Sequence, residues 1–145
     1  AQDVLIFERK DQKEWGCYGE VSNDGQWLII SVTRGTEDRN LVYVAPLPGG
    51  AVTSQTQKTL PLIDQWEASY TFLGNDTTDS QAAVKQRFYF LTDKDAATRQ
   101  IQVLEFDAAD SNLENITAHS LIAARNETIE SAALLQDQFF VHYLV

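Results

Sequence analysis

Two histidines, His119 and His142, could serve as the general base of a hydrolase, because imidazole titrates near neutral pH. His119 precedes Ser120 in a predicted outer strand, where adjacent side chains point to opposite faces, so an exposed structural histidine is favoured. His142 shares a strand face with Phe140 and Leu144, which favours a core or tunnel-lining histidine with a hydrogen-bond partner. A Gly-x-Ser-x-Gly nucleophile elbow is absent from the sequence. We therefore predict no catalytic residue in this chain.

Carboxylates could bind a metal ion, but their spacing favours turns. A calcium loop needs the run Asp-x-Asp-x-Asp-Gly, and no segment completes it. Asp side chains in turns ordinarily accept hydrogen bonds from nearby backbone N–H groups. The close acidic pairs are Asp93 with Asp95, Asp107 with Asp110, and Glu37 with Asp38. We expect capping or ion-pairing roles for them and no bound metal.

Cys17 is the single cysteine, so the chain alone cannot form an internal disulfide or a zinc-binding Cys/His pattern. A reactive thiol is activated by basic neighbours, whereas Glu14 and Glu20 flank Cys17. The strand around it predicts a small buried residue instead. The sequence therefore implies no cofactor.

Arg34 and Arg39 follow the first long apolar strand of an acidic chain. The favoured interpretation pairs them with Glu37 and Asp38 nearby. The alternative is that they face a carboxylate of a substrate. The residues themselves leave both arginines open as candidates for such a contact.

The composition limits the partners that the chain can have. It has 145 residues, with 11 basic and 21 acidic side chains and a net charge of -10, which argues against nucleic acid or an anionic membrane as a main partner. The absence of methionine predicts a piece of a longer polypeptide. No apolar run approaches 18 residues and no signal-peptide order is present, so we expect a cytoplasmic location.

Strand and turn patterns form a repeat with a period of roughly 50 to 60 residues and four strands, the range of propeller blades. Within it, Asn23-Asp24-Gly25 is a strong hairpin signal before the apolar strand Trp27–Val32. The predicted fold is all-β, with antiparallel four-stranded blades; a sandwich of about ten strands is the alternative. We expect the last strand of a preceding blade in residues 1–10 (Val4–Phe7), one blade in 15–64, a second in 66–122 and the start of a third in 129–145.

One long block carries a family resemblance. Glu-Trp-Gly-Cys-Tyr-Gly-Glu-Val-Ser-Asn-Asp-Gly-Gln-Trp-Leu-Ile-Ile-Ser-Val (residues 14–32), then Arg-Gly-Thr (34–36) and Arg-Asn-Leu-Val-Tyr-Val (39–44), resembles the propeller domain of prolyl oligopeptidase. The resemblance continues through Phe-Tyr-Phe-Leu-Thr-Asp-Lys-Asp-Ala (88–96) and residues 129–145. It covers essentially the whole chain, and the first block is its most specific part.

This resemblance implies a two-part serine peptidase. An α/β-hydrolase domain with Ser, Asp and His would cut short peptides after proline, and a seven-bladed propeller would cover the active site and exclude folded proteins. The chain would be the middle of that propeller, non-catalytic by itself. Its expected partners are the hydrolase domain, the remaining blades and, through the parent enzyme, short peptide substrates.

The resemblance also indicates where propeller residues would approach the substrate, near the Trp and Gly-Thr motifs. Gly16, Thr33 and Thr36 hold those places here, without the bulkier or charged types usual in animal members, so no binding role is transferred to them. Arg34 is the nearest basic residue and the candidate for a contact with the N-terminal side of the peptide. A later Ala-Pro-Arg motif is replaced by Ala97-Thr98-Arg99, which loses the rigid turn of proline.

Other functions share the repeat. A stand-alone propeller could be a protein-interaction module without peptidase activity. Oligopeptidase B or a dipeptidyl peptidase would share the architecture but fit the Gly-Glu-Val-Ser block less well. Separated blades would expose apolar faces of several hundred Å², so we expect the chain alone to self-associate.

Overall fold

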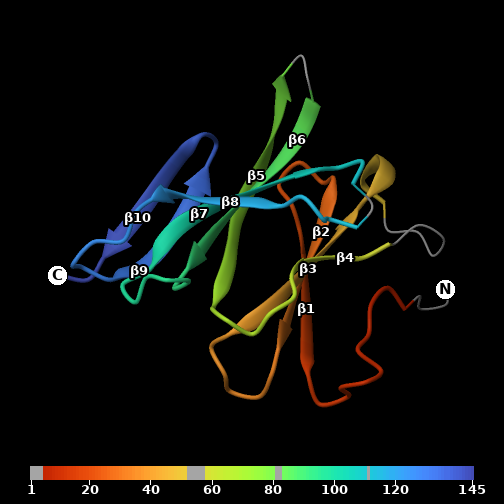
Figure 1. Cartoon of the computed structure of the whole chain (residues 1–145), viewed down its shortest axis with the longest axis horizontal. Coiled ribbons are helices and arrows are strands. Elements are labelled where there is room, and N and C mark those ends of the chain that lie inside the picture. Colours follow the sequence, from red (N-terminus) through yellow and green to blue (C-terminus); the bar gives the residue numbers. More distant parts are fainter. Residues whose placement is uncertain (1–4, 52–57, 81–82, 111) are drawn as a thin grey trace. The chain divides into compact units, whose positions relative to one another are not determined.

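The computed structural model describes residues 5–51, 58–80, 83–110 and 112–145. Within them the chain is built from antiparallel strands, with one short 3-10 turn at Pro48–Gly50 (Figure 1). It divides into two compact units, Ala1–Trp66 and Glu67–Val145, each of which has its own sheet. No helix in the described segments is long and apolar enough to cross a membrane.

The first unit contains a four-stranded antiparallel sheet in chain order β1-β2-β3-β4. Its strands are β1 (Gly16–Val21), β2 (Trp27–Thr33), β3 (Asn40–Pro46) and β4 (Leu60–Ile63). The two central strands are largely buried, as their continuous apolar runs predict. β1 is an edge strand, and most of its residues are exposed.

The β1–β2 hairpin forms at the predicted Asn-Asp-Gly signal. Gly25 adopts a positive φ of 71°, which a glycine reaches without steric cost. Oδ1 of Asp24 accepts hydrogen bonds from the Ser22 hydroxyl at 2.6 Å and from the Gln26 N–H at 3.0 Å. The Ser22 N–H donates to the Trp27 carbonyl at 2.9 Å and closes the hairpin. Local polar contacts therefore fix the register of these strands.

A compact core covers the sheet of the first unit. Ile30, Val32 and Leu41 are buried at its centre. Phe7, Trp15, Leu28, Tyr43 and Trp66 pack against them. The rings of Phe7 and Tyr43 lie 4.9 Å apart, so the N-terminal segment contributes to this core.

The predicted strand Val4–Phe7 is not seen. Val4 lies outside the described residues, and Leu5 to Phe7 have no strand assignment. A strand needs a neighbouring strand to which its N–H and C=O groups can bond, and the sheet of the first unit runs only from β1 to β4. The blade boundaries stay a prediction.

The second unit contains a four-stranded antiparallel sheet in the order β5-β6-β7-β8. Its strands are β5 (Tyr70–Ser80), β6 (Ala83–Thr92), β7 (Gln100–Asp107) and β8 (Thr117–Ile122). Aromatic rings fill its interior: Phe88 packs on Phe106 at 5.2 Å and on Phe72 at 5.5 Å between ring centroids. The two four-stranded antiparallel sheets confirm the predicted all-β fold class.

A hairpin of β9 (Ile129–Leu135) and β10 (Gln138–Tyr143) lies in the same unit. Ile129, fully buried, packs with Leu91 and Ile101 of the β5–β8 sheet. The two elements approach closely at Gly74, where a Cβ would lie 2.7 Å from Cδ2 of Leu134. Only a glycine fits here without displacement of the leucine.

Candidate functional site

The turn between β2 and β3 carries the predicted contact residue Arg34. Thr33 and Asn40 pair across its base, and Asn40 donates a side-chain hydrogen bond to the Ser31 hydroxyl at 2.9 Å. Gly35 has a positive φ of 58°, and the Glu37 N–H donates to the Arg34 carbonyl at 3.2 Å. The turn is thus a closed, hydrogen-bonded structure in which Arg34 has a defined place.

Arg34 is paired, as its spacing from Glu37 predicts. Its Nε donates to Oε2 of Glu37 at 2.6 Å, and Arg39 forms an ion pair with the other carboxylate oxygen. The Arg34 guanidinium also lies over the ring of Trp66, 4.3 Å from its centroid. Two arginines therefore share one carboxylate, and the Arg34 side chain remains 40% exposed.

Two tryptophans connect this turn to the N-terminal segment. Trp66 meets Trp15 edge to face, with ring centroids 4.9 Å apart. Arg9 lies over Trp15 at 4.7 Å, binds Asp11 through two nitrogens and donates to the Tyr43 hydroxyl at 3.2 Å. Alternating cationic and aromatic groups thus hold the turn, β3 and the N-terminal segment together.

The electrostatics keep these groups ionised. The hydrogen bond from Arg34 lowers the pKa of the Glu37 carboxyl below its ordinary value, and Glu37 raises the pKa of Arg34 in return. The Arg9 guanidinium lowers the pKa of Asp11 in the same way. Glu37 and Asp38 balance the two arginines of the turn, and the exposed part of the Arg34 guanidinium is the group that could meet an anion.

The three positions that the resemblance marks differ in their surroundings. Gly16 pairs with Thr33, and a Cβ on Gly16 would lie 2.8 Å from the Thr33 hydroxyl oxygen. A larger side chain at Gly16 would therefore have to displace Thr33. Thr36 lies in the turn itself and is exposed.

Both histidines lie on exposed strand positions. His119 is exposed on the edge strand β8, as predicted. The core position predicted for His142 is wrong: its Nδ1 lies 2.9 Å from a Glu130 carboxylate oxygen and its side chain is 67% exposed. The run Phe139–Val145 is apolar enough for a two-sided strand, but β10 alternates and covers the sheet with one face only.

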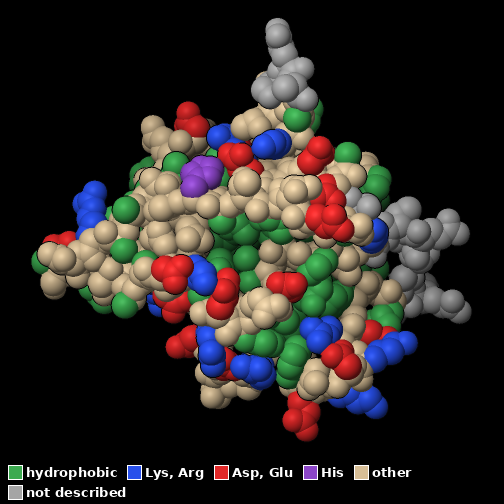
Figure 2. Space-filling view, viewed as in Figure 1, with side chains coloured by type: hydrophobic (Ala, Val, Ile, Leu, Met, Phe, Trp, Pro, Cys, Tyr) green, Lys and Arg blue, Asp and Glu red, His purple; other side chains and the backbone are tan. Residues whose placement is uncertain are grey.

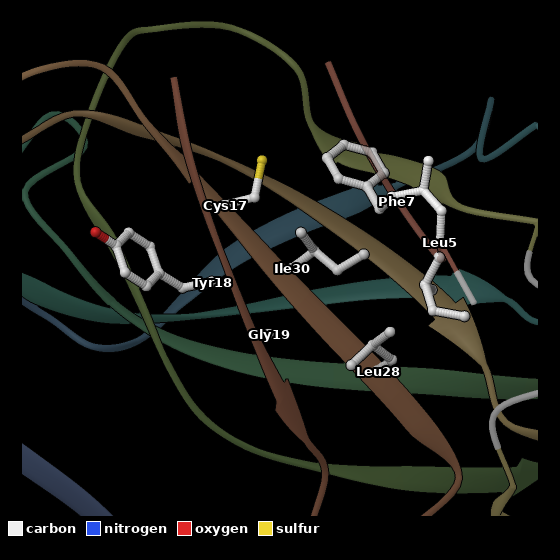
Figure 3. Close-up of a pocket in the computed structure, with 8 residues that line it drawn as sticks. Leu5, Phe7, Cys17, Tyr18, Gly19, Leu28 and Ile30 are labelled. Carbon is white, nitrogen blue, oxygen red and sulfur yellow. The ribbon is translucent and has the colours of Figure 1, made fainter. Parts of the chain in front are cut away.

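The burial predicted for Cys17 is also wrong, because β1 is an edge strand and leaves the residue exposed. Partial burial of the sulfur still raises the pKa of the thiol, so it is protonated at neutral pH. Cys17 borders an apolar pocket of about 230 Å³ (Figure 3). Leu5, Ile6, Phe7, Tyr18, Gly19, Leu28 and Ile30 form the rest of its lining.

The predicted capping carboxylates are confirmed where contacts are seen. Asp93 accepts a hydrogen bond from the Ser69 N–H at 2.8 Å, and Asp107 accepts one from Ala109 at 2.8 Å. Asp110 accepts from three backbone N–H groups of the following loop. No group of three or more His, Cys, Asp or Glu side chains among the described residues is arranged to hold a metal ion. Basic and acidic side chains intermingle on the face shown in Figure 2.

The loop at Ala97-Thr98-Arg99 closes without a proline. The Ala96 N–H donates to the Asp93 carbonyl at 3.1 Å, and the Arg99 N–H donates to the Ala96 carbonyl at 2.8 Å. Arg99 takes a positive φ of 68°. Two successive turns therefore replace the rigid turn that the family motif would provide.

Comparison with known proteins places the chain in a family. The family model described as the N-terminal beta-propeller domain of prolyl oligopeptidase matches residues 1–145. The chain belongs to this family. The recognised resemblance is thus confirmed, and the two sheets are blades of a prolyl oligopeptidase-type propeller.

Fungal relatives match this propeller chain along most of its length. It is 23% identical to prolyl oligopeptidase ophP of Omphalotus olearius over 98% of the chain and 17% of the relative. It is 23% identical to prolyl oligopeptidase A of Amanita bisporigera over 74% of the chain and 13% of the relative. The chain thus spans less than a fifth of the length of these curated relatives.

Solved structures share the fold. Prolyl oligopeptidase B of Galerina marginata, bound to a 25-residue macrocyclization substrate, superposes over 98% of the propeller chain and 18% of its own, with a TM-score of 0.80 and 17% identity. A prolyl endopeptidase superposes over 95% of the propeller chain and 18% of its own, with a TM-score of 0.73 and 20% identity.

The sequence alone did not indicate Trp66 or Arg9 as neighbours of the candidate turn. Trp66 is an isolated aromatic residue in a polar connector, Asp64-Gln65-Trp66-Glu67. A large apolar side chain in such a segment is the signal that could have indicated a packing role for it.

Proposed function

We propose that this chain is part of the non-catalytic propeller of a prolyl oligopeptidase-like serine endopeptidase. The parent would hydrolyse peptide bonds after proline, and its propeller would cover the active site and admit short peptides. The observation that carries this proposal is the family match over all 145 residues. In this proposal the chain would help to enclose the active site and would supply no catalytic residue.

The residues of the chain support a passive role. The sequence has no nucleophile elbow, both histidines are exposed, and His142 pairs with Glu130 rather than with a serine or cysteine. The sheets have central strands buried on both faces, which suits blades that pack into a rigid wall. Enclosure of that kind would exclude large substrates and shield the reaction from bulk water.

The substrate class follows from the relatives by analogy. The solved prolyl oligopeptidase B of Galerina marginata holds peptides of 25 and 35 residues. We infer that peptides, rather than folded proteins, are also the substrates of the parent of this chain. A cytoplasmic location stays a prediction.

Arg34 is the residue that we propose to contact the N-terminal side of such a peptide. It is 40% exposed, and Glu37 and Trp66 hold its guanidinium in one orientation. An oriented guanidinium loses less side-chain entropy when it binds a carboxylate or carbonyl than a free one does.

The first experiment is to translate the reading frame beyond Val145 and to search it for Gly-x-Ser-x-Gly, followed by Asp and His in that order. We expect to find all three, and the encoded polypeptide to cleave a fluorogenic peptide after proline. The purified 145-residue chain should not cleave this peptide. Further blades without a hydrolase domain would contradict the peptidase proposal and support an interaction module, and cleavage by the chain alone would contradict its non-catalytic role.

A further inference from the structure

Two arginines occupy equivalent positions in the two four-stranded sheets. Arg39 immediately precedes β3, and Arg99 immediately precedes β7. The strand registers agree, because Thr33 pairs with Asn40 and Thr92 pairs with Gln100. The local sequences, Arg-Asn-Leu and Arg-Gln-Ile, are also alike. We call Arg39 and Arg99 the junction arginines.

Each junction arginine binds the backbone of the segment that leaves its own sheet. Nη1 of Arg39 donates to the carbonyl of Trp66, which comes after β4, at 3.3 Å. Nη1 of Arg99 donates to the carbonyls of Ile129 and Glu130, which come after β8, at 3.4 and 3.3 Å. In each sheet, therefore, the arginine that precedes the third strand donates a charge-assisted hydrogen bond to a main-chain carbonyl that follows the fourth strand.

Further hydrogen bonds reinforce the second of these contacts. The Thr98 hydroxyl donates to the Arg125 carbonyl at 2.6 Å, and the Ile129 N–H donates to the Thr98 carbonyl at 2.9 Å. Ile129 is fully buried against Leu91 and Ile101. The turn before β7 therefore determines where β9 begins over the core of the β5–β8 sheet.

Arg99 has a backbone conformation that is unfavourable for a residue with a Cβ, which indicates that its side chain contributes to the structure. Its φ of 68° lies in the left-handed region, which glycine adopts readily and residues with a Cβ disfavour. Asp95 adopts a φ of 52° in the same turn, but its side chain is 83% exposed and forms only a 3.9 Å ion pair with Lys94. Asp95 is therefore a matched control for Arg99.

We propose that the junction arginines fix the exit of each four-stranded sheet: each guanidinium holds the backbone that leaves its own sheet, and within the second unit Arg99 thereby sets where β9 begins. For Arg99, the consequence is that the β9–β10 hairpin and the β5–β8 sheet behave as one body. This inference goes beyond the proposed function and does not depend on peptidase activity.

The test is hydrogen exchange, measured by mass spectrometry on the complete polypeptide that carries this chain. Arg99→Gly relieves the backbone but removes the guanidinium, whereas Asp95→Gly relieves the backbone and removes an exposed carboxylate that lies 3.9 Å from Lys94. We expect amides of residues 126–131 to exchange about tenfold faster in Arg99→Gly, as the loss of charge-assisted hydrogen bonds implies, and at an unchanged or lower rate in Asp95→Gly. Unchanged or slower exchange in Arg99→Gly would overturn the proposal for Arg99.

Arg39 provides an independent comparison. Arg39→Met keeps the length of the side chain and removes its donors, and we expect faster exchange in residues 64–68 but not in residues 126–131. Arg99→Gly should show the opposite pattern, and the amides of the β1–β2 hairpin serve as the internal reference for global opening. If either variant opens the whole chain, Thr98→Val, which removes only the hydroxyl donor, should still accelerate exchange near Arg125. If Arg39→Met accelerated exchange equally in residues 64–68 and 126–131, the two arginines would not act on separate segments, and the proposal would be contradicted.

Discussion

The Asp76 carboxylate shows how one side chain can hold a long hairpin together. It accepts two hydrogen bonds from Arg87 at 2.6 Å each and one from the Tyr89 hydroxyl at 2.8 Å. Burial raises the pKa of Asp76, but the hydrogen bonds from Arg87 and Tyr89 outweigh burial and leave this pKa below its ordinary value of 3.8. Burial, helped by the bond to Asp76, raises the pKa of Tyr89 to about 12, so its hydroxyl stays a donor at all physiological pH values.

Asp76→Asn should lower the free energy of unfolding by about 1 kcal/mol at pH 7, a value that allows for solvent screening of a half-exposed pair. The folded-state pKa is depressed, so the carboxylate contributes fully above pH 3.8 and loses its contribution as the pH falls through its lower folded value. The difference between the two proteins should therefore shrink below about pH 3.8. Urea unfolding at pH 7 and near pH 3 measures it. Asp95→Asn is the control, and a difference independent of pH would contradict the role of the charge.

Arg34→Met in the parent enzyme should raise KM about fivefold for peptides that extend on the N-terminal side, equivalent to ~1 kcal/mol, with little change in kcat. The reason is that Arg34 would bind substrate and transition state equally. Steady-state kinetics with long and truncated peptides measure this split. Arg125→Met, in which the guanidinium lost lies 5.3 Å from the Tyr143 ring, is the control. An equal KM change for both peptides would place Arg34 outside the substrate site.

Single residues divide clearly into those that the sequence could predict and those that it could not. The Arg34–Glu37 pair and the Asp107 cap depend on short spacings, and both are found. The buried position of Cys17 and the core alternative for His142 depend on which face of a strand is covered by another element, and both side chains are exposed instead. The burial of a strand residue depends on elements that are distant in the sequence, so a local sequence pattern cannot predict it.

The close approach of β5 and β9 gives a prediction for a pair of elements. Gly74 lies at a register shift in β5, and Leu134 of β9 occupies the space above it. Gly74→Ala should destabilise the protein by about 1–2 kcal/mol, because the new methyl group overpacks the contact. Leu134→Ala in the same chain should recover part of this loss.

The four proteins of this double-mutant cycle can be compared by thermal unfolding. A favourable interaction energy of at least about 0.5 kcal/mol between the two substitutions is expected. Additive losses would mean that Leu134 moves aside freely.

Elements are easier to predict than their environments. The hairpin at Asn23-Asp24-Gly25 and the apolar strands on either side of the Arg34 turn arise from turn chemistry and β-branched runs. Partial alternation in residues 100–106 is typical of an outer strand, yet β7 is the third strand of its sheet and is buried on both faces. Alternation in a short strand does not distinguish a solvent-facing side from polar residues that bond within the protein, as Gln100 does with the Lys94 carbonyl at 2.7 Å.

At the scale of the molecule, the exposed apolar residues of the β9–β10 hairpin favour association. Leu135 and Phe140 are 60% and 55% exposed. The isolated 145-residue chain should therefore form larger species as its concentration rises, and Phe140→Ser should shift them toward the monomer. Sedimentation velocity measures both. Val84→Ser, at a residue 47% exposed on β6, is the control. A monodisperse wild-type monomer that binds no ANS would contradict this prediction.

The fold of the whole chain can be predicted because its signals are repeated. Four strands per repeat and a specific block at residues 14–44 both indicate a propeller, and the family match agrees with them. The function proposed for the parent rests on the family alone, because no motif within the 145 residues identifies a reaction.

The order of the strands has a consequence for biosynthesis. In both four-stranded sheets the spatial order β1-β2-β3-β4 and β5-β6-β7-β8 is also the order of translation. Each strand pairs with the one made just before it, so every pairing closes a single connector, and contacts of low sequence separation form quickly. We expect the first sheet to fold on the ribosome while the second is still being synthesised. A ribosome that pauses within β7, when β4 has already left the exit tunnel, would therefore carry a completed first sheet, rather than unpaired strands that could aggregate with neighbouring chains on the same messenger RNA.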